Sequence, residues 1–359
     1  MSVARRALLV TPRCGDGDGV SVASLLVARS LRAAGIPLEV WGLGAIEGLD
    51  LGVRSRSSRG SRTLLGAWTA AATIGSWRGA LVVATHVHLA PLAAPLVLRG
   101  ARLAVFLHGI EVWTPLDAAR RAAARMATTL LVNSDYTRSR ARVANPELPW
   151  DRARLCPLAV PAALPSSVAR RPVAPYALLV GRMDRRERYK GHDVLLDVWP
   201  RVRRAAPAAR LVIAGDGDDR ARLEAAAARN GLAGTVEFVG RVERQQLDQL
   251  YRDCALFVMP SAGEGFGLVF VEAMRAGRAC IGGLGAAEEV IEDGVTGLIV
   301  DPARPDELSA ALVRLFRQEE LCDAMGRAGQ ARFQERFTEA AFAARLLEAL
   351  ADRGQPCAV

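Results

Sequence analysis

The fold is decided in the second half of the chain, where residues 256–273 read LFVMPSAGEGFGLVFVEA. The four apolar residues at 256–259 predict a buried strand that ends at Pro260. A glycine-rich turn follows, and a helical pattern begins near Phe266. This order of strand, loop and helix aims unpaired backbone N–H groups and the positive end of a helix dipole at an anion. The stretch therefore predicts one unit of a parallel sheet with an anion-binding turn.

Outward from this stretch, short apolar runs alternate with longer amphipathic ones in both halves of the chain. The first series of expected strands spans 7–10, 38–41, 81–84, 103–107, 129–132 and 154–156, with helical patterns at 20–34, 62–74, 116–126 and 136–143. The second series spans 176–180, 211–214, 235–239, 256–259, 279–281 and 297–300. Continuous apolar strands separated by helices imply parallel sheets covered on both faces. The sequence thus predicts an α/β protein with two doubly wound, Rossmann-like domains.

Length and proline content place the domain boundaries. At about 150 residues per domain, 359 residues predict two domains. Residues 157–175 hold five prolines, too many for a helix or a central strand. We expect an N-terminal domain at 1–160, a proline-rich linker at 161–175 and a second domain at 176–335. A C-terminal helix at 336–359 is expected to pack back on the first domain.

The net charge of +9 is unevenly distributed. Residues 1–170 hold 21 arginines against 10 acidic residues, whereas 171–359 hold 26 basic and 28 acidic residues. A basic half attracts anionic partners, although an arginine-rich solvated surface explains the same count. We expect no nucleic acid partner, because no recognised nucleic-acid motif occurs and aromatic residues make up only 5% of the chain.

Cysteines and apolar runs indicate a cytoplasmic protein. The six cysteines have no CxxC pair and no regular spacing, which favours a reducing compartment. Arg5 and Arg6 precede too few apolar residues for a signal peptide. Residues 79–98 carry no full charge, but two histidines and two prolines divide them into a strand and a short helix rather than a membrane span.

Two glutamates follow the strand that ends at Pro260. Glu264 lies in the glycine-rich loop and Glu272 lies farther on in the helix, so both can face one extended ligand. Gly265 and Gly267 would let that ligand approach the backbone closely. The alternative is a surface glutamate in a turn and a solvated helix glutamate.

A second candidate site follows the strand expected at 176–180. There Gly181-Arg182 precedes Lys190-Gly191, and Lys190 is the only lysine in the whole sequence. A chain that uses arginine everywhere else indicates here a need for a compact ammonium. Arg182 and Lys190 could neutralise a diphosphate and make it a better leaving group without a metal. The alternative is two exposed cations in an arginine-rich loop.

These segments resemble glycosyltransferase family 4, whose members have the GT-B fold. The resemblance covers nearly the whole chain, is strongest over 176–301, and rests on motifs in order: Gly181-Arg182 with Lys190-Gly191, Gly215-Asp216-Gly217, Glu264 and Glu272 within EGFGLV, and GVTGL at 294–298. It implies two Rossmann-like domains that face each other across a cleft, with an acceptor-binding domain at 1–160 and a nucleotide-sugar-binding domain at 176–335. It also implies retaining, metal-independent transfer of a hexose-like sugar from a UDP- or GDP-sugar, with no cofactor.

The resemblance also implies roles for individual residues. Arg182 and Lys190 would hold the diphosphate. Glu272 would bind the ribose hydroxyls, and Glu264 the hydroxyls of the donor sugar. Further donor contacts would come from the backbone of Phe266, Gly267, Leu268 and Val269.

The N-terminal half is expected to complete the site. His108, at the end of a strand, is similar to the family's sugar-contacting histidine, so His108 and Glu264 are the predicted reacting centre. Gly19, in the first strand-to-helix loop, would contact the diphosphate. Asp16 and Asp18 in that loop would repel it, so one of them is expected to cap the helix or to contact the acceptor.

The acceptor is expected to be a saccharide or a lipid-linked sugar of bacterial polysaccharide or glycolipid synthesis. Residues 54–78 could form a basic, tryptophan-bearing helix lying on an anionic membrane surface, or their apolar residues could face the core. Their basic and apolar members are Arg54, Arg56, Arg59, Arg62, Leu64, Leu65, Trp68, Ile74, Trp77 and Arg78. Two other functions stay open: a nucleotide-sugar epimerase or hydrolase on the same fold, and a non-catalytic basic binding module.

Overall fold

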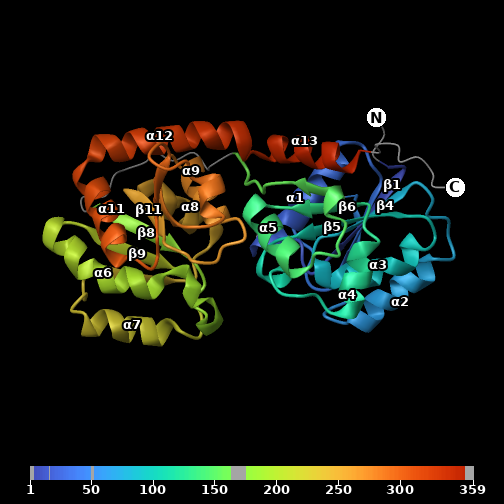
Figure 1. Ribbon diagram of the computed structural model, residues 1–359, viewed down its shortest axis with the longest axis horizontal. Coiled ribbons are helices and arrows are strands. Elements are labelled where there is room, and N and C mark those ends of the chain that lie inside the picture. The colour runs from blue at the N-terminus through green and yellow to red at the C-terminus, as the bar shows by residue number, and fades with distance from the viewer. Residues whose placement is uncertain (1–3, 16, 50–51, 163–174, 352–359) are drawn as a thin grey trace. The chain divides into compact units, whose positions relative to one another are not determined.

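The computed structural model describes residues 4–15, 17–49, 52–162 and 175–351 (Figure 1). The chain divides into two compact units. The first comprises Met1–Val160 together with Thr338–Val359, and the second comprises Pro161–Phe337. Each unit is built around its own parallel sheet.

The first unit contains a seven-stranded sheet with the order β3-β2-β1-β4-β5-β6-β7, in which every pairing is parallel. Its strands are β1 (Arg6–Thr11), β2 (Leu38–Gly42), β3 (Arg54–Ser57), β4 (Ala80–Ala84), β5 (Arg102–Leu107), β6 (Thr129–Val132) and β7 (Ala153–Leu155). Its α-helices are α1 (Gly19–Ala33), α2 (Arg62–Ala72), α3 (Ala90–Val97), α4 (Ala118–Arg125), α5 (Asp135–Ala144) and α13 (Glu339–Leu350). Central strands such as β4 are buried along their whole length, as expected for a sheet covered on both faces.

Strand β3 corrects one expectation for this unit. Its sequence Arg-Ser-Arg-Ser is exposed throughout, and it pairs with β2 at the sheet edge. Residues 54–78 therefore do not form one basic helix, because α2 begins only at Arg62. Leu65 and Trp77 are buried in the core, and the ring of Trp68 packs edge-on against Trp41 at 6.3 Å.

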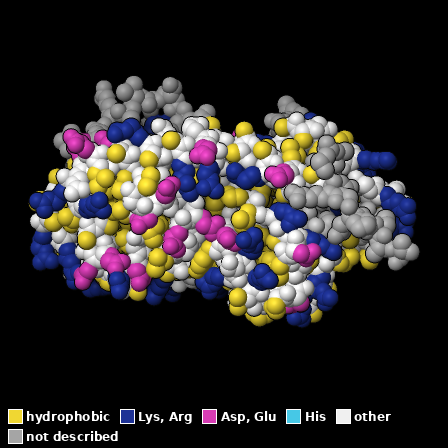
Figure 2. Space-filling view, turned by 45° about the horizontal axis from the view of Figure 1, so that its top comes forward, with side chains coloured by type: hydrophobic (Ala, Val, Ile, Leu, Met, Phe, Trp, Pro, Cys, Tyr) yellow, Lys and Arg dark blue, Asp and Glu magenta, His cyan; other side chains and the backbone are white. Residues whose placement is uncertain are grey.

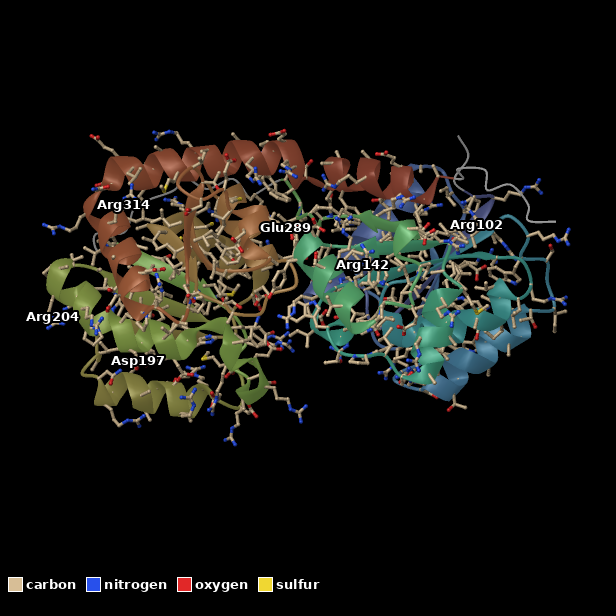
Figure 3. All side chains as sticks on the ribbon, in the orientation of Figure 1. Arg102, Arg142, Asp197, Arg204, Glu289 and Arg314 are labelled. Carbon is tan, nitrogen blue, oxygen red and sulfur yellow. The ribbon has the colours of Figure 1, made fainter. Side chains whose placement is uncertain are left out.

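Helix α13 belongs to the first unit although it is last in the sequence. It packs against α1, where Arg29 and Glu339 form an ion pair of 2.9 Å. At its other end, Arg102 (Figure 3) donates a hydrogen bond of 3.2 Å to the carbonyl of Leu350. The first unit is thus assembled from two separate segments of the chain.

The second unit contains a six-stranded parallel sheet with the order β10-β9-β8-β11-β12-β13. Its strands are β8 (Tyr176–Val180), β9 (Arg210–Ala214), β10 (Val236–Gly240), β11 (Leu256–Met259), β12 (Ala279–Gly283) and β13 (Gly297–Val300). Its helices are η4 (Arg185–Lys190), a 3₁₀ segment, and α6 (His192–Ala205), α7 (Arg220–Arg229), α8 (Arg244–Asp253), α9 (Leu268–Arg275), α10 (Ala287–Val290), α11 (Pro305–Arg317) and α12 (Glu319–Arg336). The strand order reverses between β8 and β11, which makes the loops after these strands the usual ligand-binding position.

The prediction of an α/β protein with two parallel sheets is confirmed. On the face drawn in Figure 2, basic and acidic side chains are interspersed. Within the described ranges, none of the helices combines the length and the apolar character that a membrane crossing requires.

Candidate active site

Two loops of the second unit lie in direct contact at the switch point of its sheet. One follows β8 and carries Lys190, and the other follows β11 and carries Glu264. Gly191 has a φ of +85°, and a Cβ at this position would stand 2.6 Å from the carbonyl oxygen of Pro260. Only glycine allows the two backbones to approach so closely. Gly191 therefore allows Lys190 to lie against the second loop, where Lys190 contacts Glu264.

Lys190 is the centre of the charges gathered there. Its Nζ lies 3.3 Å from Glu264 Oε1 and 3.6 Å from Glu187 Oε2. Arg182, whose side chain is 68% exposed, is bonded to the other oxygen of Glu187. The predicted residues Arg182, Lys190 and Glu264 are thus connected through one cluster. Glu187 was not predicted.

The start of helix α9 differs from the expectation by two residues. The helix begins at Leu268, because Gly267 caps it in the left-handed conformation with a φ of +89°. Phe266 is buried, and its ring packs edge-on against Phe337 at 6.1 Å. The side chain of Phe266 therefore serves packing, and a ligand contact there would involve its backbone.

Glu272 lies one turn inside α9, and both of its carboxylate oxygens are held by the protein. Arg244 Nη1 donates to Oε1 at 2.6 Å, and the Tyr251 hydroxyl donates to Oε2 at 2.9 Å. Burial, together with the Glu272 carboxylate, raises the pKa of Tyr251 well above its ordinary value, so the hydroxyl stays protonated. Among the described residues, this network makes no hydrogen bond or ion pair with Lys190 or Glu264.

A further charge network fixes the loop that carries Lys190. Asp219, just before α7, accepts two hydrogen bonds from Arg188 at 3.0 and 3.1 Å and two from Arg222 at 2.8 and 2.6 Å. Arg222 also makes a two-bond ion pair with Asp193 on α6. The hydrogen bonds from Arg222 and Arg188 hold the pKa of Asp219 well below its usual range, although its burial opposes this shift. The network connects η4 to helices α6 and α7.

In the first unit, His108 follows β5. Its Nε2 lies 2.7 Å from the carbonyl oxygen of Thr85, and its backbone N–H donates to Glu111 at 2.6 Å. Burial lowers the pKa of His108, so the ring is neutral at neutral pH. A neutral ring that faces a carbonyl with Nε2 carries its proton there, which leaves Nδ1 as an acceptor. Nδ1 has no hydrogen-bond partner within the described ranges and can accept a hydrogen bond from a hydroxyl.

His86 caps a short 3₁₀ helix at Val87–Leu89, and His88 is the middle residue of that helix. The rings of His86 and His108 are stacked 6.2 Å apart. Burial lowers the pKa of His86 to about 4. In the part of the chain that is described, no group of three or more potential ligands is placed to hold a metal ion.

The loop before α1 shows how Asp18 acts. Its Oδ1 accepts hydrogen bonds from the backbone N–H groups of Val20 and Ser21, each at 3.0 Å. Asp18 therefore caps α1, and capping was one of the two roles that the sequence predicted for Asp16 or Asp18. Gly19 is the first, exposed residue of that helix, next to the Asp18 carboxylate. Asp16 lies outside the described residues.

Sequence reasoning missed Glu187, Arg244, Tyr251 and Asp219. Glu187 stands three residues before Lys190, and this spacing on a helical turn is a usable signal. Arg244 reaches Glu272 across 28 positions of sequence, and Tyr251 across 21. No local pattern marks such contacts.

The comparisons with known proteins agree with this geometry. Residues 174–318 match the family model described as glycosyl transferases group 1. The chain is 34% identical over 265 residues to a GDP-mannose-dependent α-(1-6)-phosphatidylinositol monomannoside mannosyltransferase of Mycobacterium tuberculosis, covering 67% of this chain and 68% of the relative. Its counterpart in Mycolicibacterium smegmatis is 32% identical over 298 residues, covering 73% and 75% of the two chains.

Solved structures share the fold over most of the chain. Anabaena HepE in complex with UDP and glucose has a TM-score of 0.78 at 19% identity and covers 96% of this chain and 99% of its own. Sucrose-phosphate synthase from Thermosynechococcus elongatus has a TM-score of 0.78 at 20% identity, with coverage of 96% and 98%. With the parallel sheets, the paired loops and these relatives in agreement, the chain belongs to glycosyltransferase family 4 and is a glycosyltransferase of the GT-B fold.

Proposed function

We propose that this protein transfers a hexose-like sugar from a nucleotide-diphosphate donor to a saccharide or lipid-linked acceptor, with retention of configuration and without a metal ion. Of the UDP- and GDP-sugars that the sequence left open, the names of the mannosyltransferase relatives favour GDP-mannose. Those names also favour a glycolipid acceptor. The observation that carries the proposal is the contact of Lys190 with Glu264 across two loops.

The second unit is proposed to bind the donor. Lys190 and Arg182 supply two positive charges for the diphosphate, and the loop between β11 and α9 ends at a helix N-terminus that favours an anion. Glu264, next to Lys190, would bind hydroxyls of the donor sugar. Glu272 would bind the ribose. Backbone groups would complete the site at Phe266, Gly267, Leu268 and Val269.

The chemical step needs stabilisation of a separating charge pair. As the bond between the anomeric carbon and the phosphate oxygen breaks, the sugar gains cationic character and the diphosphate gains negative charge. Lys190 and Arg182 stabilise the departing diphosphate, which is where fixed charges lower the barrier most. The acceptor oxygen forms the new bond, and its proton passes to the donor phosphate.

His108 is the proposed contact of the first unit. Its unprotonated Nδ1 would accept a hydrogen bond from a sugar hydroxyl. Gly19 is proposed to offer its backbone N–H to the diphosphate. The Asp18 carboxylate beside it opposes an anion, so we expect the contribution of Gly19 to be small.

A thermal-shift panel tests the donor. UDP-, GDP-, ADP- and dTDP-sugars are each added to the wild type and to Lys190→Ala, since a ligand that binds only the folded state raises its Tm. We expect GDP-mannose to shift the wild type and not the variant. A shift that is equal in both proteins would refute the placement of the diphosphate at Lys190.

Two assays test the reaction. The anomeric configuration of the product, read by NMR, should equal that of the donor, and an inverted product would contradict retention. Donor consumption without acceptor should be slow. Fast consumption under that condition would favour the epimerase or hydrolase alternative.

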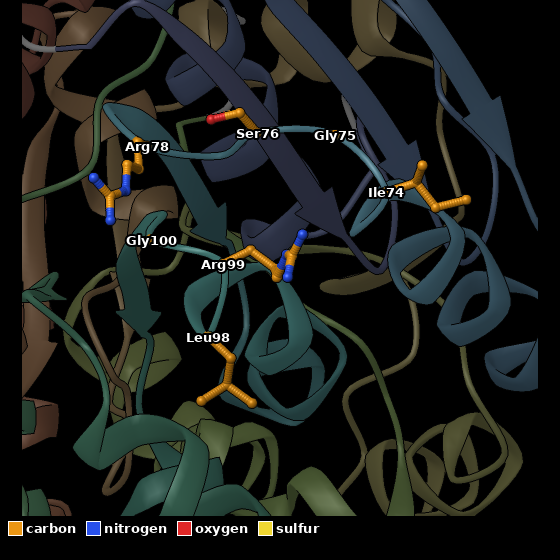
Figure 4. Close-up of a pocket in the computed structure, with 7 residues that line it drawn as sticks. All are labelled: Ile74, Gly75, Ser76, Arg78, Leu98, Arg99 and Gly100. Atoms are coloured by element: carbon orange, nitrogen blue, oxygen red, sulfur yellow. The ribbon is translucent and has the colours of Figure 1, made fainter.

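Membrane contact is proposed for a different surface from the tryptophan-bearing helix that the sequence suggested. A pocket of about 560 Å³ opens beside the start of β4 and β5 (Figure 4). Its apolar members are Ile74, which is 89% exposed, and Leu98, which is 77% exposed. We call it the edge pocket; it is lined by Ile74, Gly75, Ser76, Arg78, Leu98, Arg99 and Gly100.

The arginines around the edge pocket favour binding to an anionic bilayer. Arg78 and Arg99 line the pocket, and Arg6 lies beside it, donating 2.6 Å to the carbonyl of Ser76. Among the described residues, none of these three arginines has a carboxylate partner within ion-pair distance. Arginines that surround exposed apolar side chains suit anionic lipid headgroups above an acyl layer. The edge pocket and His108 lie at opposite ends of β5, about 20 Å apart, so the pocket would tether the enzyme rather than bind the acceptor.

Vesicle sedimentation tests this contact. We expect binding to vesicles that contain phosphatidylglycerol and not to pure phosphatidylcholine vesicles, with at least a fivefold loss in Ile74→Asp/Leu98→Asp. Val143→Asp is the matched control, because Val143 is 85% exposed on α5 and outside the edge pocket. Equal binding by all three proteins would exclude the edge pocket as the membrane surface.

A further inference from the structure

Glu187 is an acid inside a site that is proposed to bind an anion. It lies within η4, where its φ of −113° and ψ of 27° interrupt the helical path. Its side chain is only 14% exposed. Oε1 is bonded to Arg182, and Oε2 is 3.6 Å from Lys190 Nζ. One carboxylate therefore contacts both cations that the donor diphosphate would need.

The second oxygen of Glu187 is unusual. Oε2 is buried and has no hydrogen-bond partner among the described residues, since Lys190 is too distant for a bond. A buried carboxylate that served stability alone would be expected to have both oxygens satisfied. Glu264 differs from Glu187. Among the described residues, Glu264 contacts Lys190 but not Arg182. The position of Glu187 is therefore better explained by the cations than by packing.

We infer that Glu187 is the internal counter-ion of the diphosphate site and that it weakens the binding of nucleoside diphosphates. With the site empty, its charge holds Arg182 and Lys190 in place. A bound diphosphate shares the same two cations and is repelled by the nearby carboxylate. After transfer, when the diphosphate leaves, the carboxylate neutralises the cations again. This inference rests on the proposed function, and it concerns release of the nucleotide product rather than the chemical step.

Isothermal titration of the full-length protein with GDP and UDP tests the inference. Glu187→Gln keeps the size of the side chain and an oxygen that can accept from Arg182, but removes the charge. We expect this variant to bind the preferred diphosphate at least fivefold more tightly than the wild type. Its affinity for the corresponding nucleoside, which has no phosphate, should be unchanged. The gain should shrink as salt is raised from 50 to 500 mM, because salt screens the repulsion.

Two further variants separate charge from shape. Glu187→Asp keeps the charge and should not bind the diphosphate more tightly. Glu224→Gln removes an exposed glutamate of α7, paired with Arg220, and should leave the affinity at the wild-type value. Equal or weaker diphosphate binding by Glu187→Gln, with a wild-type Tm, would overturn the inference.

The same titrations distinguish the inference from the proposed function. If the wild type binds a diphosphate and Lys190→Ala does not, the donor site stands, and a failure of Glu187→Gln to tighten binding refutes the counter-ion alone. If the wild type and Lys190→Ala bind no nucleoside diphosphate, the proposed donor site and the counter-ion are both refuted.

Discussion

The backbone N–H of Ala262 donates a hydrogen bond of 2.8 Å to the carbonyl oxygen of Tyr189. This bond joins the loop that carries Lys190 to the loop that carries Glu264, next to the close approach of Gly191 and Pro260. The proposed donor site thus depends on backbone contact between two loops as well as on its charged side chains.

Gly191→Ala should disrupt this contact. The new Cβ would lie 2.6 Å from the Pro260 carbonyl at a φ of +85°, so one loop must move. We expect kcat/KM to fall at least tenfold and the free energy of unfolding to fall by roughly 2 to 3 kcal/mol. Urea unfolding and initial-rate assays measure both quantities.

Gly231→Ala is the matched control for that change. Gly231 also has a positive φ, +67°, but nothing lies within 4 Å of its Cβ position. We expect about 1 kcal/mol of destabilisation from the backbone conformation alone and no loss of activity. If the two variants were equally active, the close contact at Gly191 would not matter for the donor site.

Lys190→Ala and Glu264→Ala should each lower the rate of transfer at least tenfold, which is about 1.4 kcal/mol of transition-state stabilisation. Each removes one partner of the 3.3 Å contact between the loops. Lys190→Arg should not restore full activity, because a planar guanidinium cannot take the position of a compact ammonium. Wild-type rates in folded Lys190→Ala would refute its role.

Tyr251→Phe should weaken nucleotide binding through Glu272. It deletes the 2.9 Å hydrogen bond to Oε2 and leaves the 2.6 Å bond from Arg244 to Oε1 in place. We expect a three- to tenfold higher KM for the donor with little change in kcat, and a stability loss of about 1 kcal/mol. A large fall in kcat at unchanged KM would contradict a role in ribose binding.

Transfer should be independent of divalent metal, because Lys190 and Arg182 are proposed to supply the charge that stabilises the leaving diphosphate. Activity in EDTA should stay within twofold of that in Mg²⁺. Mg²⁺ should not rescue Lys190→Ala. A loss of more than tenfold in EDTA that Mg²⁺ reverses would show that the two cations are insufficient.

Acidification should destabilise the fold through His192, which is buried, and His86, which is partly buried. Burial lowers the pKa of His86 and of His192 to about 4 each. Below pH 6.5 the unfolded chain gains protons on these rings, while the folded protein gains them only near pH 4. The free energy of unfolding is therefore highest above pH 6.5. It falls towards pH 4 by up to about 3 kcal/mol per histidine.

The measurement is the urea midpoint at pH 7.5, 6.5, 5.5 and 4.5. His192→Gln should make its pH dependence less steep than in the wild type. An identical dependence in both proteins would exclude His192 as a contributor.

The sequence predicted the strands well where they are buried. β8, β11 and β13 match their expected limits, because each is a short apolar run between helices. β3 was missed, because an exposed edge strand of arginine and serine carries no apolar signal. The start of α9 was placed two residues early, since the left-handed conformation of Gly267 is a backbone property that the residue type alone does not fix.

The candidate site was predictable in its residue types and not in its pairings. Lys190 could be identified by its uniqueness in an arginine-rich chain. Its contact with Glu264, 74 positions away, depends on the parallel pairing of β8 with β11. The partners of Glu272 depend in the same way on how α8 lies against α9. Such contacts follow from the sheet order and not from local spacing.

Because α13 returns to the first unit, a single proteolytic cut need not separate the two units. The polypeptide passes from one unit to the other twice, after Val160 and after Phe337. A protease that cut only at the first passage would leave a fragment in which α13 is still covalently attached to the second unit. Because α13 packs on α1, the nicked halves would still hold together through a helix that both share.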